Sequence, residues 1–185
     1  FDDNQAGAFA MSSFSGSTIV TSAVNISAAW LTSYGTAIGS YAFQTYLHEI
    51  GHALGLGHAG NYNGGADYLT DALYANDSWQ ATLMSYFSQS ENGYVADTMA
   101  YVVTPMTADI VAIQNLYGTG ATARTTGTVY GDGQTAGNGI YSLAGNVALT
   151  LFDTGGTDTI NLASRSQSQR LDLRPVMSLK SSVST

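Results

Sequence analysis

The chain has 185 residues, which is enough for one domain with a sizeable hydrophobic core. Only 10% of its residues are charged and the formal net charge is −8, which argues against nucleic acid or an anionic membrane surface as a partner, because both attract basic residues. No apolar run approaches the ~20 residues of a membrane span, and the lack of cysteine excludes disulfides.

Two strands are predicted near the N-terminus. Residues 6–14 and 17–29 are rich in small and β-branched side chains, and the pair Ser15-Gly16 between them is typical of a turn. A helix is expected to follow, because Phe43, Tyr46, Leu47, Ile50, Ala53 and Leu54 recur at steps of three and four residues as an apolar stripe.

The segment HEIGHALGLGH, residues 48–58, contains all three histidines of the chain. On a helix, His48 and His52 lie on one face with Cβ atoms about 5–6 Å apart, so both can bind one ion. Gly55 allows the helix to stop and the chain to reverse, which can bring His58 back as a third ligand. The alternative, a polar helix with incidental histidines, leaves this spacing unexplained.

Three protein ligands leave one coordination position for water, as in catalytic rather than structural zinc sites. Zinc is the expected metal because it accepts neutral imidazoles and a low coordination number. Glu49 follows the first ligand and suits a general base acting on the bound water.

Residues 60–80 are predicted to be a loop, with Gly64-Gly65 as a break. We interpret Asp67, Asp71 and Asp77 as solvated loop acids rather than calcium ligands. A helix is predicted over residues 107–117, with Thr107 as its N-cap, Asp109 in its first turn and Gly118 at its end.

The composition changes from about Thr119, where glycine and threonine become frequent and strands are predicted at 140–152 and 159–173. Asp153 and Asp158 flank Gly155-Gly156, and carboxylates beside an open backbone are typical of calcium sites. The same residues also fit a plain turn, so both interpretations stay open.

The histidine segment matches the HExxHxxGxxH signature of the metzincin metalloproteases at every fixed position. The segment LMSYF, residues 83–87, resembles the methionine turn of that family. The resemblance makes Met84 the structural methionine. It makes Tyr86 a catalytic tyrosine that can bind zinc and stabilise the transition state.

Several stretches resemble the serralysin branch of the metzincins, which also lacks disulfides. They are residues 74–87, 105–118, 124–131 and 153–162. Serralysins usually have proline after the third histidine, where this chain has Ala59.

The resemblance implies further site residues. Gly7, Ala8 and Phe9 would form the cleft edge that pairs with a bound peptide, although an ordinary sheet strand fits them equally well. The calcium ligands would be the carbonyls of Arg124 and Thr126 with Thr128 and Gly155, beside Gly156 and the two aspartates.

The expected fold is α+β. Residues 1–118 would be the C-terminal part of a metzincin catalytic domain, with cleft-edge strands and the zinc helix. Residues 119–185 would begin a β-rich, calcium-binding region that leads into a repeat domain. No GGxGxD array is present, so either the repeat domain was removed or the chain ends before it.

Only about forty residues precede the zinc helix, whereas a metzincin has further strands and a long helix there. We therefore expect the chain to be a fragment, or one piece of a nicked protein whose remaining part is a separate partner chain.

The predicted function is a secreted bacterial zinc endopeptidase that acts on protein or peptide substrates, with calcium as a second cofactor. Serralysins leave the cell through a C-terminal signal, so no N-terminal leader is expected. Two alternatives are zinc-dependent hydrolysis of a non-peptide bond, and an inactive or incomplete fragment that acts as a binding module.

Overall fold

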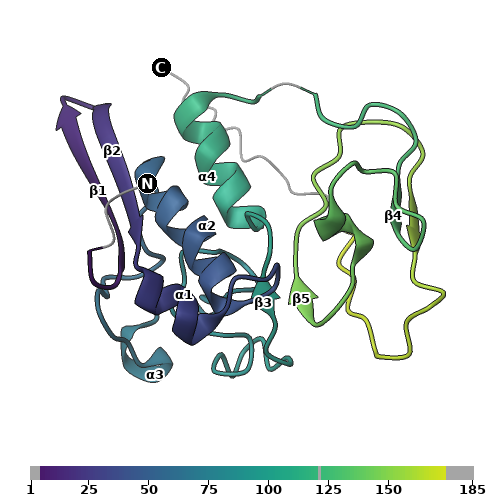
Figure 1. The fold of residues 1–185 in the computed structure, drawn as a ribbon, viewed down its shortest axis with the longest axis horizontal. Coiled ribbons are helices and arrows are strands. Elements are labelled where there is room, and N and C mark those ends of the chain that lie inside the picture. Colours follow the sequence, from purple (N-terminus) through teal and green to yellow (C-terminus); the bar gives the residue numbers. More distant parts are fainter. Residues whose placement is uncertain (1–4, 121, 174–185) are drawn as a thin grey trace, which may run out of the picture.

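The computed structural model describes residues 5–120 and 122–173. Figure 1 shows the helices α1, α2 and α4 with a β-hairpin on one side, and a strand-and-turn region containing β4 and β5 on the other. Among the described residues, no helix is both long and apolar enough to span a membrane.

The first two strands form an antiparallel hairpin, β1 (Ala8–Ser15) with β2 (Thr18–Ile26). Ala8 lies opposite Ile26, and the register shifts between Ser13 and Phe14. The two predicted strands are confirmed, but the second one ends earlier than residue 29.

The chain leaves the hairpin through a short helix, α1 (Ala28–Tyr34). Ser27 is its N-cap, and its hydroxyl accepts the backbone N–H of Trp30 at 3.2 Å. The strand prediction extended too far because it did not recognise Ser27 as a helix start.

The helix that carries the histidine motif is α2 (Tyr41–Ala53), and the Ser40 hydroxyl caps it by accepting the Phe43 N–H at 3.2 Å. The predicted apolar stripe is only partly buried, since Ile50 is 36% and Leu54 43% exposed. The buried positions are instead small or polar: Ala42, Gln44, Thr45, Glu49 and Gly51. The helix therefore packs through close approach and hydrogen bonds; Gln44 Oε1, for example, accepts the Val102 N–H at 2.7 Å.

A long segment from Leu54 to Ala100 contains only one short helix, α3 (Tyr68–Asp71). Hydrogen bonds from buried polar side chains, rather than helices or strands, fix the conformation of this segment. Asn92 donates to the carbonyls of Ala75 at 3.1 Å and Asp77 at 2.9 Å, and the Gln89 side chain bonds both backbone groups of Ala100. The segment is thus ordered by specific contacts.

The apolar core lies where this segment meets the helices. Its buried members are Trp79, Leu83, Val102 and Met106. Val102 belongs to β3 (Tyr101–Val102), which pairs in parallel with β5 (Val147–Ala148). This pairing ties the C-terminal region to the helical part of the molecule.

The predicted helix at 107–117 is confirmed as α4 (Thr107–Tyr117), followed by Gly118 at φ 86°. Its N-cap is Met106 rather than Thr107, because the Asp109 carboxylate reaches back to the Met106 N–H at 2.8 Å. The buried carboxylate performs the capping that was assigned to the threonine hydroxyl.

The C-terminal region has shorter strands than predicted at 140–152 and 159–173. It contains β4 (Val129–Gly131), the 3₁₀ turn η1 (Gly139–Ser142), β5 and β6 (Thr159–Asn161). β4 and β6 pair in parallel from Val129 opposite Thr159 to Gly131 opposite Asn161. Each of these strands is only two or three residues long. Residues 174–185 of the predicted β-rich region lie outside the described residues.

Candidate metal centre

The three histidines meet as the motif predicts. Their Nε2 atoms lie 3.1 Å apart for His48 and His52, 2.9 Å for His52 and His58, and 3.2 Å for His48 and His58. His58 is brought back by a tight reversal in which Gly55 has φ 94° and the Leu56 N–H donates to the Gly51 carbonyl. Among the described residues, this is the one group of three histidine, cysteine or acidic side chains close enough to share a metal ion.

Each imidazole is held by its other nitrogen. The Nδ1–H groups donate to the carbonyls of Leu83 at 3.0 Å (from His48), Leu56 at 2.8 Å (from His52) and Tyr62 at 2.8 Å (from His58). A carbonyl only accepts, so the proton of each neutral ring resides on Nδ1 and the Nε2 lone pair is free. Three lone pairs therefore face one another, an arrangement that a cation stabilises.

Burial favours the neutral form of the His48 and His58 rings. It lowers the pKa of His48 to about 4, and the neighbouring histidines act in the same direction while the Leu83 carbonyl opposes them. Burial and then His52 lower the pKa of His58. Neutral imidazoles are the form that binds metal.

The geometry fits zinc. Two nitrogens bound to a tetrahedral ion at about 2.0–2.1 Å stand about 3.3 Å apart, close to the separations found here. All three ligands are neutral nitrogens held by backbone carbonyls, as is usual for histidines at zinc sites.

Glu49 follows the first ligand on α2 and is only 7% exposed. Burial raises the pKa of its carboxyl group to about 7, although a hydrogen bond with the backbone of Ala10 in β1 acts against this shift. A carboxyl group that titrates near neutral pH can both take up and release a proton, as a general base must.

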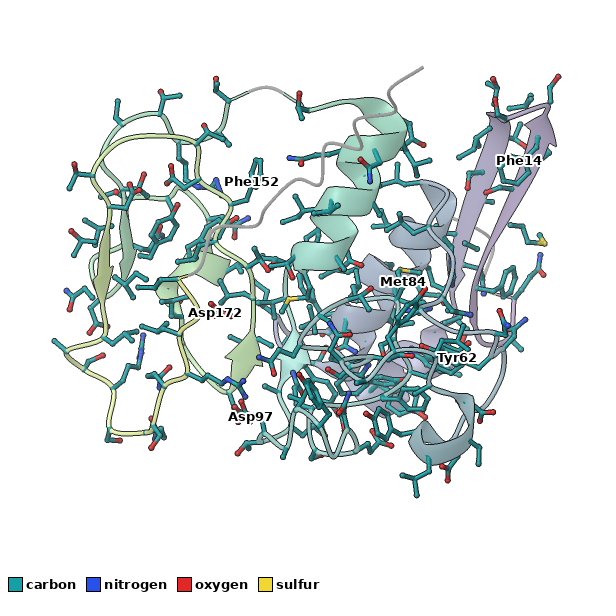
Figure 2. The ribbon with its side chains drawn as sticks, turned by 180° about the vertical axis from the view of Figure 1, so that it is seen from behind. Phe14, Tyr62, Met84, Asp97, Phe152 and Asp172 are labelled. Atoms are coloured by element: carbon teal, nitrogen blue, oxygen red, sulfur yellow. The ribbon has the colours of Figure 1, made fainter. Side chains whose placement is uncertain are left out.

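Met84 is 2% exposed and its side chain lies against Gly51 of α2; Figure 2 labels this residue. A Cβ atom added to Gly51 would lie 2.6 Å from the Met84 sulfur, so a larger residue at this position would displace the Met84 side chain. The methionine prediction is consistent with this packing, while the role of Gly51 between the first two ligands was missed.

Asp109 was predicted only as a favourable residue in a helix first turn, but it has a larger role. It is 2% exposed and accepts the Thr82 hydroxyl at 2.6 Å and the Leu83 N–H at 2.8 Å. Leu83 in turn provides the carbonyl that orients His48. The carboxylate thus connects α4 to a metal ligand through the methionine turn.

The structure brings Tyr86 to the metal centre. Its ring centroid lies 4.6 Å from that of His58 and 6.0 Å from that of His48. Its hydroxyl oxygen accepts the Gly64 N–H at 3.4 Å. The hydroxyl is therefore placed beside the histidines and in reach of the long loop.

Tyr62 and Asp77 were missed as site residues. Tyr62 is 5% exposed and stacks on His58, and its hydroxyl donates to the Asp77 carboxylate. Asp77 is only 2% exposed, so its interpretation as a solvated loop acid is wrong. In the sequence, Asp77 neither begins a predicted helix nor adjoins a glycine turn, so no pattern signalled that it would be buried.

Of the residues predicted for the cleft edge, Ala8 and Phe9 begin β1 and Gly7 precedes it. The Gly7 carbonyl accepts the Ser27 N–H, so the alternation of an antiparallel ladder turns the backbone groups of Ala8 and Ala10 away from β2. In the described part of the chain, β1 pairs only with β2, which leaves this edge open beside α2.

The two segments predicted to bind calcium lie against each other. The Thr128 N–H donates to Asp158 at 3.0 Å, and its hydroxyl donates to the Thr126 carbonyl at 3.0 Å. A Cβ on Gly156, which has φ 103°, would lie 2.5 Å from the Thr126 carbonyl carbon. Only glycine permits this approach.

The remaining predicted calcium ligands belong to the same region. Asp153 accepts the Gly155 N–H at 3.0 Å and the Tyr130 hydroxyl at 2.6 Å, and the latter bond is the main reason why its pKa is lowered. Arg124 has φ 54°, and its guanidinium donates to the hydroxyl of Tyr130. The structure thus gathers all the predicted residues in one region.

Comparison with known proteins identifies the family. The family model described as Peptidase M66 matches residues 30–136. Serralysin C of Dickeya chrysanthemi is 43% identical over 139 residues, which cover 72% of this chain and 29% of that protein. Metalloprotease AprA of Pseudomonas entomophila (strain L48) is 39% identical over 143 residues, covering 73% of this chain and 30% of that protein.

A third relative, the serralysin of Proteus mirabilis, is 39% identical over 158 residues, covering 79% of this chain and 32% of that protein. The chain therefore spans about 30% of the length of these curated relatives. The match includes the zinc motif and the methionine turn, which lie within residues 30–136. The chain belongs to the Peptidase M66 family and is a relative of the serralysin metalloproteases.

Proposed function

We propose that the protein is a zinc endopeptidase and that this chain carries its metal ligands and its general base. The observation that supports this most strongly is the convergence of three Nε2 lone pairs, each set by an Nδ1–H bond to a backbone carbonyl. The metalloprotease relatives favour the same function.

His48, His52 and His58 would hold the zinc ion, leaving one position open. When bound, zinc supplies a Lewis acid that lowers the pKa of water to about 7 and polarises a carbonyl group. The peptide bond would be broken by water, so that one product gains a carboxylate and the other an amine.

Glu49 would take the proton from the attacking water and pass it to the nitrogen of the leaving amine. Its buried position keeps this carboxyl group in a weakly polar environment, where its pKa is about 7. The carboxylate form accepts the first proton readily, and the resulting acid can release it in the second step.

Tyr86 would donate its hydroxyl hydrogen to the oxygen on which negative charge develops. Its position beside His58 supports this role, because the reacting carbonyl must lie close to the metal ligands. We also propose that Tyr86 binds the zinc ion when no substrate is bound.

The open edge of β1 would bind the substrate as an additional antiparallel strand. Gly7, Ala8 and Phe9 remain the proposed segment, and the ladder alternation makes the backbone groups of Ala8 and Ala10 the ones that face the open edge. Because Ala10 also interacts with Glu49, this edge would bring the peptide directly to the general base.

We further propose that Ca²⁺ stabilises the C-terminal region through Asp153, Asp158 and the carbonyl-rich turn at Arg124–Thr128. Carboxylate and carbonyl oxygens are the ligands that Ca²⁺ prefers. By resemblance to the serralysins, the protein would be secreted from a bacterial cell.

The test is Glu49→Gln in the full-length protein, with Glu91→Gln as the matched control. Glu91 is exposed and its carboxylate accepts the Ser88 hydroxyl. We expect Glu49→Gln to retain zinc and to lose casein hydrolysis at least about 100-fold, in line with the loss of a general base. Normal cleavage by this variant would overturn the mechanism. A wild-type protein that binds zinc and cleaves neither casein nor gelatin would support a binding module instead.

A further inference from the structure

The Tyr62 side chain lies between the third metal ligand and the proposed oxyanion donor. Its ring stacks on His58 at a centroid distance of 5.6 Å and an interplanar angle of 25°. Its ring also lies 4.8 Å from that of Tyr86 and 5.2 Å from that of Phe87. One aromatic side chain thus contacts both groups, and Figure 2 shows it in the same part of the molecule as Met84.

The contact with His58 does not need the Tyr62 hydroxyl. The ligand is held by the Tyr62 backbone carbonyl, which accepts its Nδ1–H at 2.8 Å, and by the face of the ring. A phenylalanine at this position would keep both interactions. The hydroxyl is therefore available for a separate task.

The hydroxyl is anchored at a fixed, buried carboxylate. It lies 3.1 Å from each oxygen of Asp77, which is 2% exposed. The backbone of Asp77 is itself held, since its N–H donates to Tyr74 and its carbonyl accepts the Asn92 amide. A carboxylate held in this way restrains the orientation of the Tyr62 ring.

The hydroxyl also lies beside the turn that carries Tyr86. Burial raises the pKa of Tyr62 to about 12, while hydrogen bonds with the Ser85 side chain and the Tyr86 backbone act in the opposite direction. The phenol therefore remains protonated and can always donate to Asp77. Two residues further on, the Gly64 N–H reaches the hydroxyl of Tyr86 itself.

We propose that Tyr62, anchored by Asp77, is a positioning residue that holds the Tyr86 side chain at the metal centre in the orientation needed for catalysis. This inference rests on the proposed function, because it assigns to Tyr86 a role in the reaction. Tyr62 acts through Tyr86 and does not itself touch the reacting atoms.

The test is Tyr62→Phe in the full-length protein, with Tyr68→Phe as the matched control. Tyr68→Phe also removes one hydroxyl hydrogen bond, which Tyr68 donates to the Ala75 carbonyl at 2.7 Å. The Tyr68 ring also packs on Phe87. Zinc content and the kcat and KM for a casein-derived peptide are measured for both. The same substitutions are then made in a Tyr86→Phe background.

We expect Tyr62→Phe to keep one zinc and an unchanged KM while kcat falls about 10-fold, the size usual for residues that orient a ligand or catalytic group. In the Tyr86→Phe background, Tyr62→Phe should change kcat less than about 2-fold, since the Tyr86 hydroxyl that Tyr62 positions is then absent. Tyr68→Phe should leave kcat unchanged. Asp77→Asn is a second variant, and it is also expected to lower kcat. If Tyr62→Phe does not fold, Asp77→Asn replaces it in the comparison with and without the Tyr86 hydroxyl.

The inference is overturned if Tyr62→Phe matches Tyr68→Phe in kcat, if its effect is as large without the Tyr86 hydroxyl as with it, or if it loses zinc. A failure of the proposed function would look different, because the wild-type protein itself would then show no zinc-dependent peptide hydrolysis.

Discussion

The Nδ1–H group of His48 donates a hydrogen bond to the backbone carbonyl of Leu83, 35 residues further along the chain, at 3.0 Å. The backbone N–H of Leu83 in turn donates to the Asp109 carboxylate at 2.8 Å. The orientation of a metal ligand on α2 therefore depends on a carboxylate at the start of α4.

Replacing Asp109 by alanine should destabilise the protein and weaken zinc binding together. The change leaves the N–H groups of Leu83 and Met106 without their buried acceptor, which costs about 3 kcal/mol in the free energy of unfolding. Urea unfolding and the rate of zinc loss to a chelator measure the two effects. Asp97→Asn is the control, because it removes a partly exposed ion pair with Arg170 and should cost less than about 1 kcal/mol. Unchanged zinc release in the Asp109 variant would contradict the connection.

Metal-free protein should lose stability as the pH falls from about 6.5 to about 4. The unfolded chain binds a proton at His48 over this range, whereas the folded chain does not, because its pKa is lowered from 6.5 to about 4. The free energy of unfolding should drop by up to about 3 kcal/mol, and His58 adds to the same trend. Chemical unfolding in the presence of a chelator gives the pH profile. His48→Gln should show a shallower profile, and an identical one would refute the assignment.

Substituting Tyr86 by phenylalanine should reduce kcat about 100-fold and leave KM nearly unchanged. The ring stays packed between His58 and Tyr62, so zinc binding and substrate binding persist while the proposed oxyanion donor is lost. Steady-state hydrolysis of a peptide, with zinc content determined on the same samples, separates these effects. A variant with normal kcat would exclude a catalytic role for the hydroxyl.

The central features of the metal centre could be predicted because they depend on local spacing. His48 and His52 are four positions apart on one helix, and Gly55 supplies the reversal that returns His58. The helix at 107–117 was equally clear, since a glycine follows it directly. In these segments the determining interactions lie within a few residues along the chain.

The residues that support the centre were not predictable in the same way. Tyr62 meets Asp77 across 15 residues, and Thr82 meets Asp109 across 27. An aspartate in a loop looks the same in sequence whether it is solvated or buried, so only tertiary packing distinguishes Asp77 from Asp67, the exposed cap of α3. The strands after residue 119 were overestimated for a related reason, because only the few residues that pair with a distant segment form strand, and the sequence does not show where the partner lies.

Calcium should raise the melting temperature of the protein through the C-terminal region. A Ca²⁺ ion bound by Asp153 and Asp158 would hold the segment 153–158 against the turn at 124–128. Thermal unfolding with and without Ca²⁺ should show the increase in the wild type and not in Asp158→Asn. Asp132→Asn is the control, since Asp132 bonds Ser164 on a neighbouring turn. An equal calcium effect in Asp158→Asn would place the ion elsewhere.

The central claim is that His48, His52 and His58 form the zinc site of a peptidase, and a zinc titration of the full-length protein tests it most directly. Protein stripped by a chelator is titrated with Zn²⁺ while casein hydrolysis is followed. We predict no hydrolysis before zinc is added, and a rise in proportion to zinc up to one equivalent, absent from His52→Gln. Hydrolysis by the stripped protein, or stoichiometric zinc binding that restores none, would contradict the account.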